Sequence, residues 1–108
     1  MEKRFTSFKE FYPFYLSQHQ DRICRLLHVI GTTIVLSLTF TAVYHLNFRL
    51  FIYVPIAGYG FAWIGHFFFE KNKPATFKYP LWSLKADFKM YFDILMGKLS
   101  LDASKDKI

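Results

Sequence analysis

The chain has 108 residues, of which 53% are hydrophobic and 21% aromatic, and its formal net charge is +6. A soluble domain of this length has an unfavourable ratio of surface to volume and would have difficulty burying so much aromatic surface. The composition therefore favours a membrane protein over a soluble enzyme. The single cysteine, Cys24, excludes an internal disulfide and is interpreted as a small apolar packing residue. The N-terminal segment lacks an uninterrupted apolar core and a small-residue cleavage site, so we do not interpret it as a secretory signal.

The first predicted element is an amphipathic helix over about residues 5–19. Aromatic side chains recur there at helical spacing, at Phe5, Phe8, Phe11, Tyr12 and Tyr15. We expect this helix to lie in the membrane interface. A break is expected near Gln20, with Asp21 as the N-cap of the next helix.

Two apolar segments follow, and each has the length of a membrane span. They are predicted over about residues 22–46, with the core "LLHVIGTTIVLSLTFTAVYHL", and over about residues 50–70, with the core "LFIYVPIAGYGFAWIGHFFF". A stretch of roughly 20 apolar residues is enough to cross the hydrocarbon layer as a helix. Only "NFR" separates the two cores, so the sequence predicts a tight helical hairpin.

The last predicted element is a second amphipathic helix over about residues 80–97, followed by a polar tail over residues 98–108. Pro80 suits the first turn of this helix and Gly97 suits its end. Its apolar stripe consists of Leu81, Leu84, Phe88, Tyr91, Phe92 and Leu95. The predicted fold class is all-α: one membrane domain over residues 1–108, with two transmembrane spans and an interfacial amphipathic helix at each end.

The distribution of Lys and Arg predicts the orientation of the hairpin. Basic residues flank the outer ends of both spans, whereas the connecting turn holds only Arg49; the flanking residues are Lys3, Arg4, Lys9, Arg22, Arg25, Lys71, Lys73, Lys78, Lys85, Lys89 and Lys98. The positive-inside rule then places both termini in the cytoplasm, in the inner membrane of a bacterium or the endoplasmic reticulum of a eukaryote. We expect the positive charge to attract anionic lipid headgroups, and we expect no nucleic-acid partner because no groove-reading motif accompanies it.

The predicted topology brings three of the four histidines to one membrane depth. His28 lies near the cytoplasmic end of the first span, His66 and Glu70 lie near the same end of the second, and His19 lies just before the membrane. His66 and Glu70 are four residues apart and therefore share a helix face. His45 is 17 residues beyond His28, about 25 Å along a helix, so we expect it at the far interface and not at this site.

The residues leave two interpretations of this cluster open. Imidazoles with one carboxylate and no thiolate suit Fe(II), Mn or Zn, and ionisable groups at membrane depth indicate function. Alternatively, each histidine is a structural residue that hydrogen-bonds a neighbouring backbone group. Arg25 and Lys73 are candidate binding residues for an acidic headgroup or a substrate carboxylate, and ordinary membrane anchoring is the alternative for both.

The segments "FYLSQHQDRICRLLHVIGT" and "GYGFAWIGHFFFEKNKPATFKYPLWSL" resemble a small membrane family, formerly a domain of unknown function, with a fungal 2-hydroxy fatty acid dioxygenase of the endoplasmic reticulum as its characterised member. The resemblance covers roughly residues 11–99. It implies an Fe(II)-dependent α-oxidation, in which dioxygen cleaves a 2-hydroxy fatty acid beside its carboxyl group and leaves a chain one carbon shorter. It further implies a metal bound by His19, His28, His66 and Glu70, with His28, His66 and Glu70 catalytic.

A different class of function remains open beside this one. The chain would then be a non-catalytic membrane protein that binds lipid or a protein partner, with structural histidines. Two spans form a small enclosure that a homo-oligomer would enlarge, but nothing in the sequence specifies an interface between copies.

Overall fold

The computed structural model describes residues 5–74 and 78–103. Within these ranges every regular element is helical and no strand occurs, which confirms the all-α prediction. The basic residues Lys3 and Arg4 and the end of the predicted tail, residues 104–108, lie outside the described residues. In chain order the elements are α1 (Phe8–Ser17), α2 (Arg22–Tyr44), the 3₁₀ segment η1 (Phe48–Ile52), α3 (Tyr53–Ile64), the π-helical segment η2 (Gly65–Glu70) and α4 (Pro80–Leu95).

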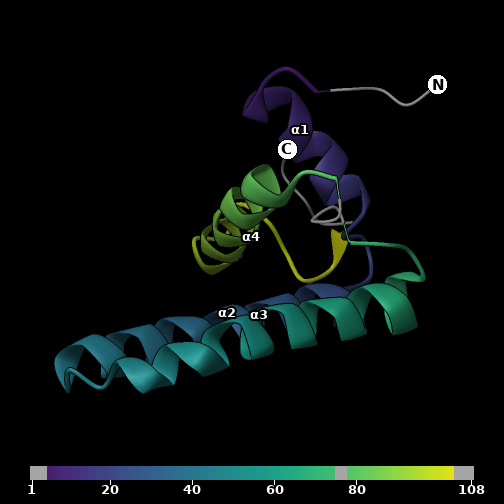
Figure 1. Ribbon diagram of the computed structural model, residues 1–108. Coiled ribbons are helices and arrows are strands. Elements are labelled where there is room, and N and C mark those ends of the chain that lie inside the picture. The colour runs from purple at the N-terminus through teal and green to yellow at the C-terminus, as the bar shows by residue number, and fades with distance from the viewer. Residues whose placement is uncertain (1–4, 75–77, 104–108) are drawn as a thin grey trace.

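Helix α2 and the continuous run η1–α3–η2 lie side by side in opposite directions and are joined by a short turn (Figure 1). Glycines let the two helices approach closely. A Cβ at Gly31 would lie 3.2 Å from the carbonyl oxygen of Ala57, and a Cβ at Gly65 would lie 3.1 Å from the Cα of Cys24. Small residues at such contacts are typical of helices that pack within membranes.

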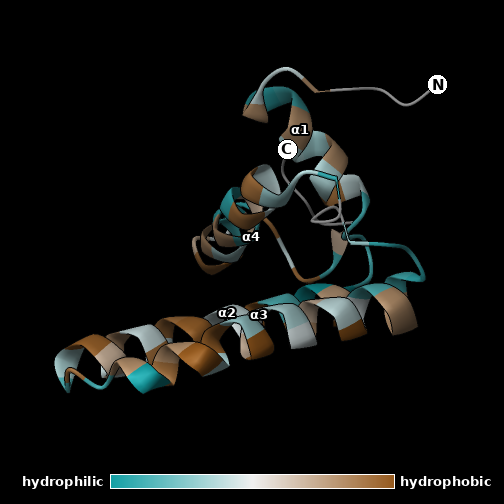
Figure 2. Ribbon diagram, in the orientation of Figure 1, coloured by the Kyte–Doolittle hydropathy of each residue, from teal (hydrophilic) through white to brown (hydrophobic). Residues whose placement is uncertain are grey.

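Both arms of this pair are long and apolar enough to cross a membrane, judged by length and composition. The candidate spans are Arg22–Tyr44 and Phe48–Glu70, of 23 residues each, with mean hydropathies of 1.9 and 1.3. They agree with the predicted spans to within two residues at each end. The arm that extends beyond α4 is largely apolar on its surface (Figure 2), and Phe40, Ile52 and Ile56 are each more than 60% exposed there.

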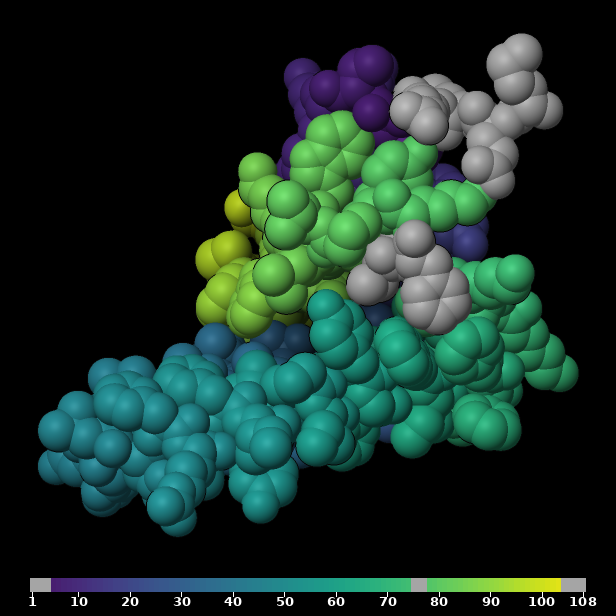
Figure 3. All heavy atoms as spheres, viewed as in Figure 1, coloured from purple at the N-terminus to yellow at the C-terminus, as the bar shows by residue number. Residues whose placement is uncertain are grey.

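Helices α1 and α4 pack against each other on one side of the hairpin, where α4 lies between α1 and the long helices (Figures 1 and 3). Their shared core is aromatic and aliphatic, and consists of Phe11, Tyr12, Tyr15, Leu16, Ala86, Met90 and Leu99. A hydrogen bond of 2.9 Å from the Tyr12 hydroxyl to Asp93 Oδ2 adds a polar tie. Helix α1 thus buries its aromatic side chains against Ala86 and Met90 of α4. Most of the predicted apolar stripe of α4 is instead exposed, namely Leu81, Leu84, Phe92 and Leu95. Placement of the two helices in a membrane interface remains a prediction.

The helix ends follow the capping residues of the sequence. Helix α1 is shorter than the predicted 5–19, because Ser7 caps its start by accepting a hydrogen bond from Glu10 N–H. The predicted break before α2 is confirmed: Asp21 is its N-cap, and Asp21 Oδ1 accepts from Ile23 N at 2.8 Å and Cys24 N at 3.0 Å. Helix α4 ends at Leu95, and Gly97 follows with φ +81°, a left-handed conformation that favours glycine.

Candidate metal centre

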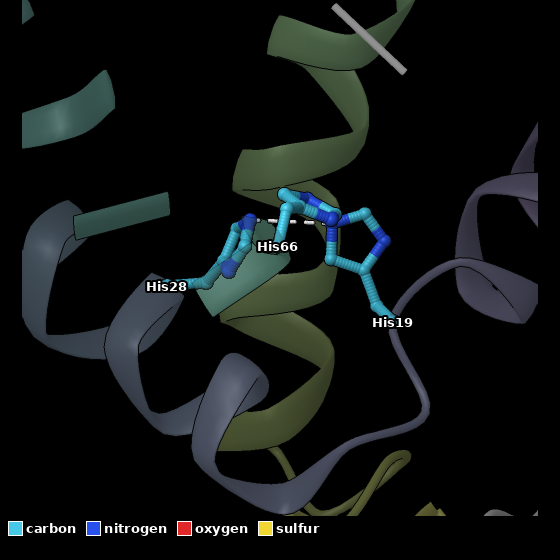
Figure 4. A group of neighbouring side chains, drawn as sticks. All are labelled: His19, His28 and His66. Atoms are coloured by element: carbon cyan, nitrogen blue, oxygen red, sulfur yellow. Dashed lines mark hydrogen bonds between the residues drawn. The ribbon is translucent and has the colours of Figure 1, made fainter. Parts of the chain in front are cut away.

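Three histidines from three different segments meet beneath α1 and α4. His19 comes from the connection between α1 and α2, His28 from α2 and His66 from η2 (Figure 4). They are 1%, 6% and 1% exposed, respectively. One ring nitrogen from each lies within 4.8 Å of the other two, and His19 Nε2 lies 3.2 Å from His28 Nε2. The sequence prediction that these three residues converge is confirmed.

Hydrogen bonds to the other ring nitrogen fix the tautomer of each imidazole. His19 Nδ1 lies 2.6 Å from the Tyr15 carbonyl oxygen, and His28 Nδ1 lies 2.8 Å from the Cys24 carbonyl oxygen. Carbonyl oxygens only accept hydrogen bonds, so both Nδ1 atoms carry the proton. Each Nε2 atom then presents a lone pair.

Asn72 gives His66 the same arrangement. His66 Nδ1 lies 2.7 Å from Asn72 Oδ1, while Asn72 Nδ2 donates to the carbonyl oxygen of Gln18 at 3.0 Å and to Gln18 Oε1 at 3.2 Å. Because the Asn72 amide nitrogen is held by two oxygens, its Oδ1 faces His66 and accepts from Nδ1–H. Such outer hydrogen bonds orient metal-binding histidines and fix which nitrogen ligates.

The resulting donor set fits a metal ion. With all three Nδ1 atoms protonated, the lone pairs of His19 Nε2 and His28 Nε2 face each other across 3.2 Å, an unfavourable contact unless a cation lies near both. Two imidazole nitrogens bound at about 2.1 Å to one ion are roughly 3.0–3.4 Å apart, depending on the angle between them. The histidines also border a cavity of only about 10 Å³, the scale of a single atom.

The π-helical shape of η2 positions His66 and its partner Asn72. The N–H groups of Lys71 and Asn72 both donate to the His66 carbonyl oxygen, and Lys71 adopts a left-handed conformation with φ +60°. The chain therefore reverses directly after η2 and returns the Asn72 side chain to the His66 ring. Single π-helical turns inside longer helices occur frequently at functional sites.

Glu70 and His45 are not part of the cluster of three histidines. The Glu70 carboxylate accepts a hydrogen bond from the backbone N–H of Asp21, which ties η2 to the start of α2. Among the described residues, the ligand atoms that lie within 4.8 Å of one another belong to His19, His28 and His66 and do not include Glu70. Ligation by Glu70 stays a prediction. His45 is the C-cap of α2, exposed at the other end of the hairpin, as predicted.

The two predicted binding residues differ in exposure. Arg25 is fully buried, and its guanidinium donates to the carbonyl oxygens of His19 at 2.5 Å and Ser100 at 2.6 Å. Arg25 therefore fixes the segment that carries His19. Lys73 is exposed beyond the end of η2. Substrate binding by either residue stays a prediction.

Sequence reasoning missed two polar residues that border the small cavity, Asp87 and Ser83. The Tyr15 hydroxyl donates to Asp87 Oδ1, and the Tyr15 ring stacks on His19 with 3.9 Å between ring centroids. Ser83 Oγ is buried and has no hydrogen-bond partner among the described residues. The sequence contains a signal that could have identified Asp87. This charged residue lies three positions after Leu84 and four before Tyr91, and therefore on the apolar stripe of α4, where a carboxylate is unexpected.

Burial shifts the protonation of the groups around the cavity. Burial, reinforced by the neighbouring His28 and His66, holds the pKa of His19 well below its ordinary value, so the imidazole stays neutral and able to ligate. Burial raises the pKa of Asp87 to about 7, although the hydrogen bond from Tyr15 opposes this shift. Burial and then the Asp87 carboxylate raise the pKa of Tyr15 well above its ordinary value, so its hydroxyl remains a donor.

Residues 5–99 match the protein family described as 2-hydroxy-palmitic acid dioxygenase Mpo1-like. The chain belongs to this family. The match includes the three clustered histidines, His19, His28 and His66, and most of the chain. It confirms the resemblance found in the sequence. No curated protein matches the Mpo1-like chain, and no solved structure does.

Proposed function

We propose that the Mpo1-like chain is an integral membrane dioxygenase that binds Fe(II) through His19, His28 and His66 and shortens 2-hydroxy fatty acids by one carbon. The observation that carries this proposal is the common tautomer of the three buried imidazoles, each with Nδ1–H engaged and Nε2 free of a backbone partner. Family membership supplies the reaction class and the substrate class. Histidine with open positions for substrate and dioxygen is the donor chemistry of non-haem iron oxygenases.

The bound iron would supply the redox activation of dioxygen. The chain's own residues have three tasks. They hold one ring nitrogen of each histidine within 4.8 Å of the other two, they keep His19 neutral through burial, and they exclude water with the aromatic core of α1 and α4. The overall reaction balances without a separate reductant: a 2-hydroxy acid and dioxygen give the acid one carbon shorter, carbon dioxide and water.

Asp87 provides a carboxyl group beside the centre that can exchange a proton near neutral pH, because its pKa is raised to about 7. The Tyr15 hydroxyl donates to Asp87 Oδ1 and so fixes the orientation of that carboxyl. The cleavage converts a hydroxyl carbon into a carboxyl carbon, which requires the substrate hydroxyl to lose its proton. Asp87 is the titratable carboxyl that borders both the small cavity and the larger one beside it.

The same proposal places the hairpin across a membrane with both termini in the cytoplasm. Its support is the length and apolar surface of the two candidate spans and the basic residues that flank them. Single cysteines at Thr6→Cys and Ala103→Cys, in a Cys24→Ala background, test the orientation. Both should react with an impermeant reagent from the same side, and opposite sides would contradict the hairpin topology.

Metal analysis of anaerobically purified protein tests the function. We expect about one iron per chain, together with iron-dependent conversion of 2-hydroxypalmitate to the acid one carbon shorter. His66→Ala should lose both properties. A folded wild-type protein that neither contains nor accepts iron would contradict the proposal and favour a non-catalytic lipid- or partner-binding protein with structural histidines.

A further inference from the structure

A second, larger cavity lies between the hairpin and α4 and begins at the histidine centre. Its volume is about 250 Å³, and α2, α3 and α4 each contribute to its wall. It shares His28, Tyr59, Ala62 and Asp87 with the small cavity beneath the histidines. The two spaces are therefore neighbours with a common border. An engineered cavity of roughly 150 Å³ is enough to hold a benzene molecule, so this one can take a substantial part of a ligand.

The polar groups of the larger cavity gather at one end. His28 and Asp87 stand where it borders the histidine centre, while the wall further along the hairpin is aliphatic and includes Val35, Val54 and Pro55. Val35 is seven residues beyond His28 on α2, so the apolar part extends roughly 10 Å from the centre along the hairpin. It runs towards the turn and not towards the chain ends. A ligand with a polar head and an apolar chain fits this gradient.

The cavity also has an exposed border. Tyr59 on α3 and Leu84 on α4 both contribute to its wall and are 38% and 48% exposed. Helix α4 lies over the hairpin on this side (Figures 1 and 3). In the proposed membrane orientation Tyr59 lies within the second candidate span, so this border is open to the hydrocarbon layer, where the chain of a fatty acid lies.

We propose that this cavity is the acyl-chain site of the enzyme, with the carboxyl and 2-hydroxyl groups at His28 and Asp87 and the chain extending from there past Gly58 to Val35 and Val54. This rests on the proposed function and adds the position, direction and selectivity of the substrate. The ligand is an acyl chain, because the polar side chains His28, Thr32 and Asp87 lie towards the histidine centre and the wall beyond Thr32 along the hairpin is apolar. Bulk at Val35 or Val54 then limits how long a chain can be accepted.

Val35 and Leu36 offer a matched pair of substitutions. They are adjacent in α2, but Val35 borders the cavity whereas the Leu36 side chain is exposed on the hairpin surface. Val35→Phe fills the apolar part of the cavity, and Leu36→Phe adds the same ring where lipid would surround it. A Cβ at Gly58 would lie 3.3 Å from Val35 Cγ2, so a larger side chain at position 35 has little room on the α3 side and must turn into the cavity.

The test compares the rates for 2-hydroxy acids of eight and sixteen carbons. For Val35→Phe, kcat/KM for the long acid should fall about 10-fold or more relative to the short one, the size of effect expected when a pocket loses methylene contacts. Leu36→Phe should keep the wild-type ratio. Val54→Phe, on the facing helix, should repeat the Val35→Phe result, which keeps the test decisive if one variant does not fold.

A binding readout separates this inference from the proposed function. A 2-hydroxy fatty acid with a photoreactive diazirine in mid-chain should label peptides of α2 and α3 that border the cavity, and Val35→Phe should abolish that labelling while iron content stays unchanged. Labelling confined to the exposed arm, or equal chain-length ratios for Val35→Phe and Leu36→Phe, would overturn the acyl-chain site. Absence of iron and of turnover at every chain length would overturn the proposed function instead.

Discussion

The two ends of the helical hairpin both carry histidine but use it differently. At the turn, His45 caps α2, is exposed and contacts the Tyr44 ring at 4.9 Å between centroids. At the other end, His28 and His66 are buried, and each Nδ1 is held by an acceptor. The difference teaches that residue type alone does not make a ligand in this chain. Burial together with a fixed tautomer turns imidazole into a directed donor.

Removal of a ligand should give the largest difference between the two ends. His28→Ala or His66→Ala removes one of three nitrogen donors, so we expect loss of stoichiometric iron after anaerobic purification. His45→Ala should retain the wild-type iron content, measured by elemental analysis per chain. The reverse pattern, with iron lost only in His45→Ala, would show that both the topology and the metal centre are wrong.

Loss of an outer hydrogen bond should give the next largest effect. Asn72→Ala removes the acceptor that holds His66 Nδ1–H, and such outer partners are typically worth about 10–100-fold in metal affinity. We expect a loss of that size in metal titrations of the apoprotein. Asn72→Asp keeps an oxygen acceptor and should recover much of the affinity, which a merely structural role of the Asn72 amide would not explain.

The same substitution at the turn provides the control for Asn72→Ala. Asn47 is exposed at the start of η1, so Asn47→Ala should leave the metal affinity unchanged. Equal losses for Asn72→Ala and Asn47→Ala would point to a general loss of stability, and the assigned role of Asn72 would then be wrong.

Glycine substitutions test how closely the two arms must approach at the metal end. A Cβ at Gly65 would lie 3.0 Å from Cys24 Sγ and 3.1 Å from Cys24 Cα, whereas a Cβ at Gly60 would meet nothing within 4 Å. Gly65→Ala should therefore push η2 away from α2 and weaken metal binding several-fold. Gly60→Ala adds the same methyl group where there is open space, so it should leave metal binding unchanged and serves as the control. Equal affinities for the two variants would contradict the close packing at Gly65.

Glu70→Gln distinguishes two roles of one residue. The structure has the carboxylate accepting from Asp21 N–H, and a glutamine amide oxygen can still accept that bond. If the tie to Asp21 is the role of Glu70, the Gln variant retains its iron and Glu70→Ala loses part of it, and this is the result we expect. Complete loss of iron in Glu70→Gln would instead establish Glu70 as a ligand, as the sequence predicts.

The sequence predicted the features that depend on one segment at a time. The two helices long enough to span a membrane follow from runs of apolar residues, and the break before α2 follows from the capping preference of Asp21. Convergence of three histidines was also predictable, because the charge asymmetry predicted a topology that put His19, His28 and His66 at one depth, and the three residues do lie together. The resemblance to the family then named the reaction class.

The features that sequence reasoning missed depend on contacts between distant segments. Arg25 was expected at the membrane surface, but it is buried by the segment around Ser100, a contact across 75 positions. The π-helical turn of η2, which positions His66 and Asn72, was not predicted, because no simple spacing rule announces such a turn. Asp87 was visible as a charge on an apolar stripe, but its partner Tyr15 lies 72 positions away.

The smallest expected effect is a pH dependence that Asp87 imposes on the metal-free protein. Its pKa is about 7 in the folded protein because burial disfavours the carboxylate, whereas an unfolded Asp titrates near about 3.9. Between these values the folded state binds more protons than the unfolded state, so the free energy of unfolding contributed by Asp87 falls as pH rises from about 4 to about 7. His19 acts in the opposite direction below about pH 6.5, since its lowered pKa makes the unfolded state the one that gains a proton.

Comparison with Asp87→Asn cancels the His19 contribution, because both proteins share it. We therefore expect the Tm of wild-type apoprotein in detergent to fall relative to that of Asp87→Asn as pH is raised from about 5 to 8, and a Tm difference that does not change with pH would show that Asp87 is ionised throughout.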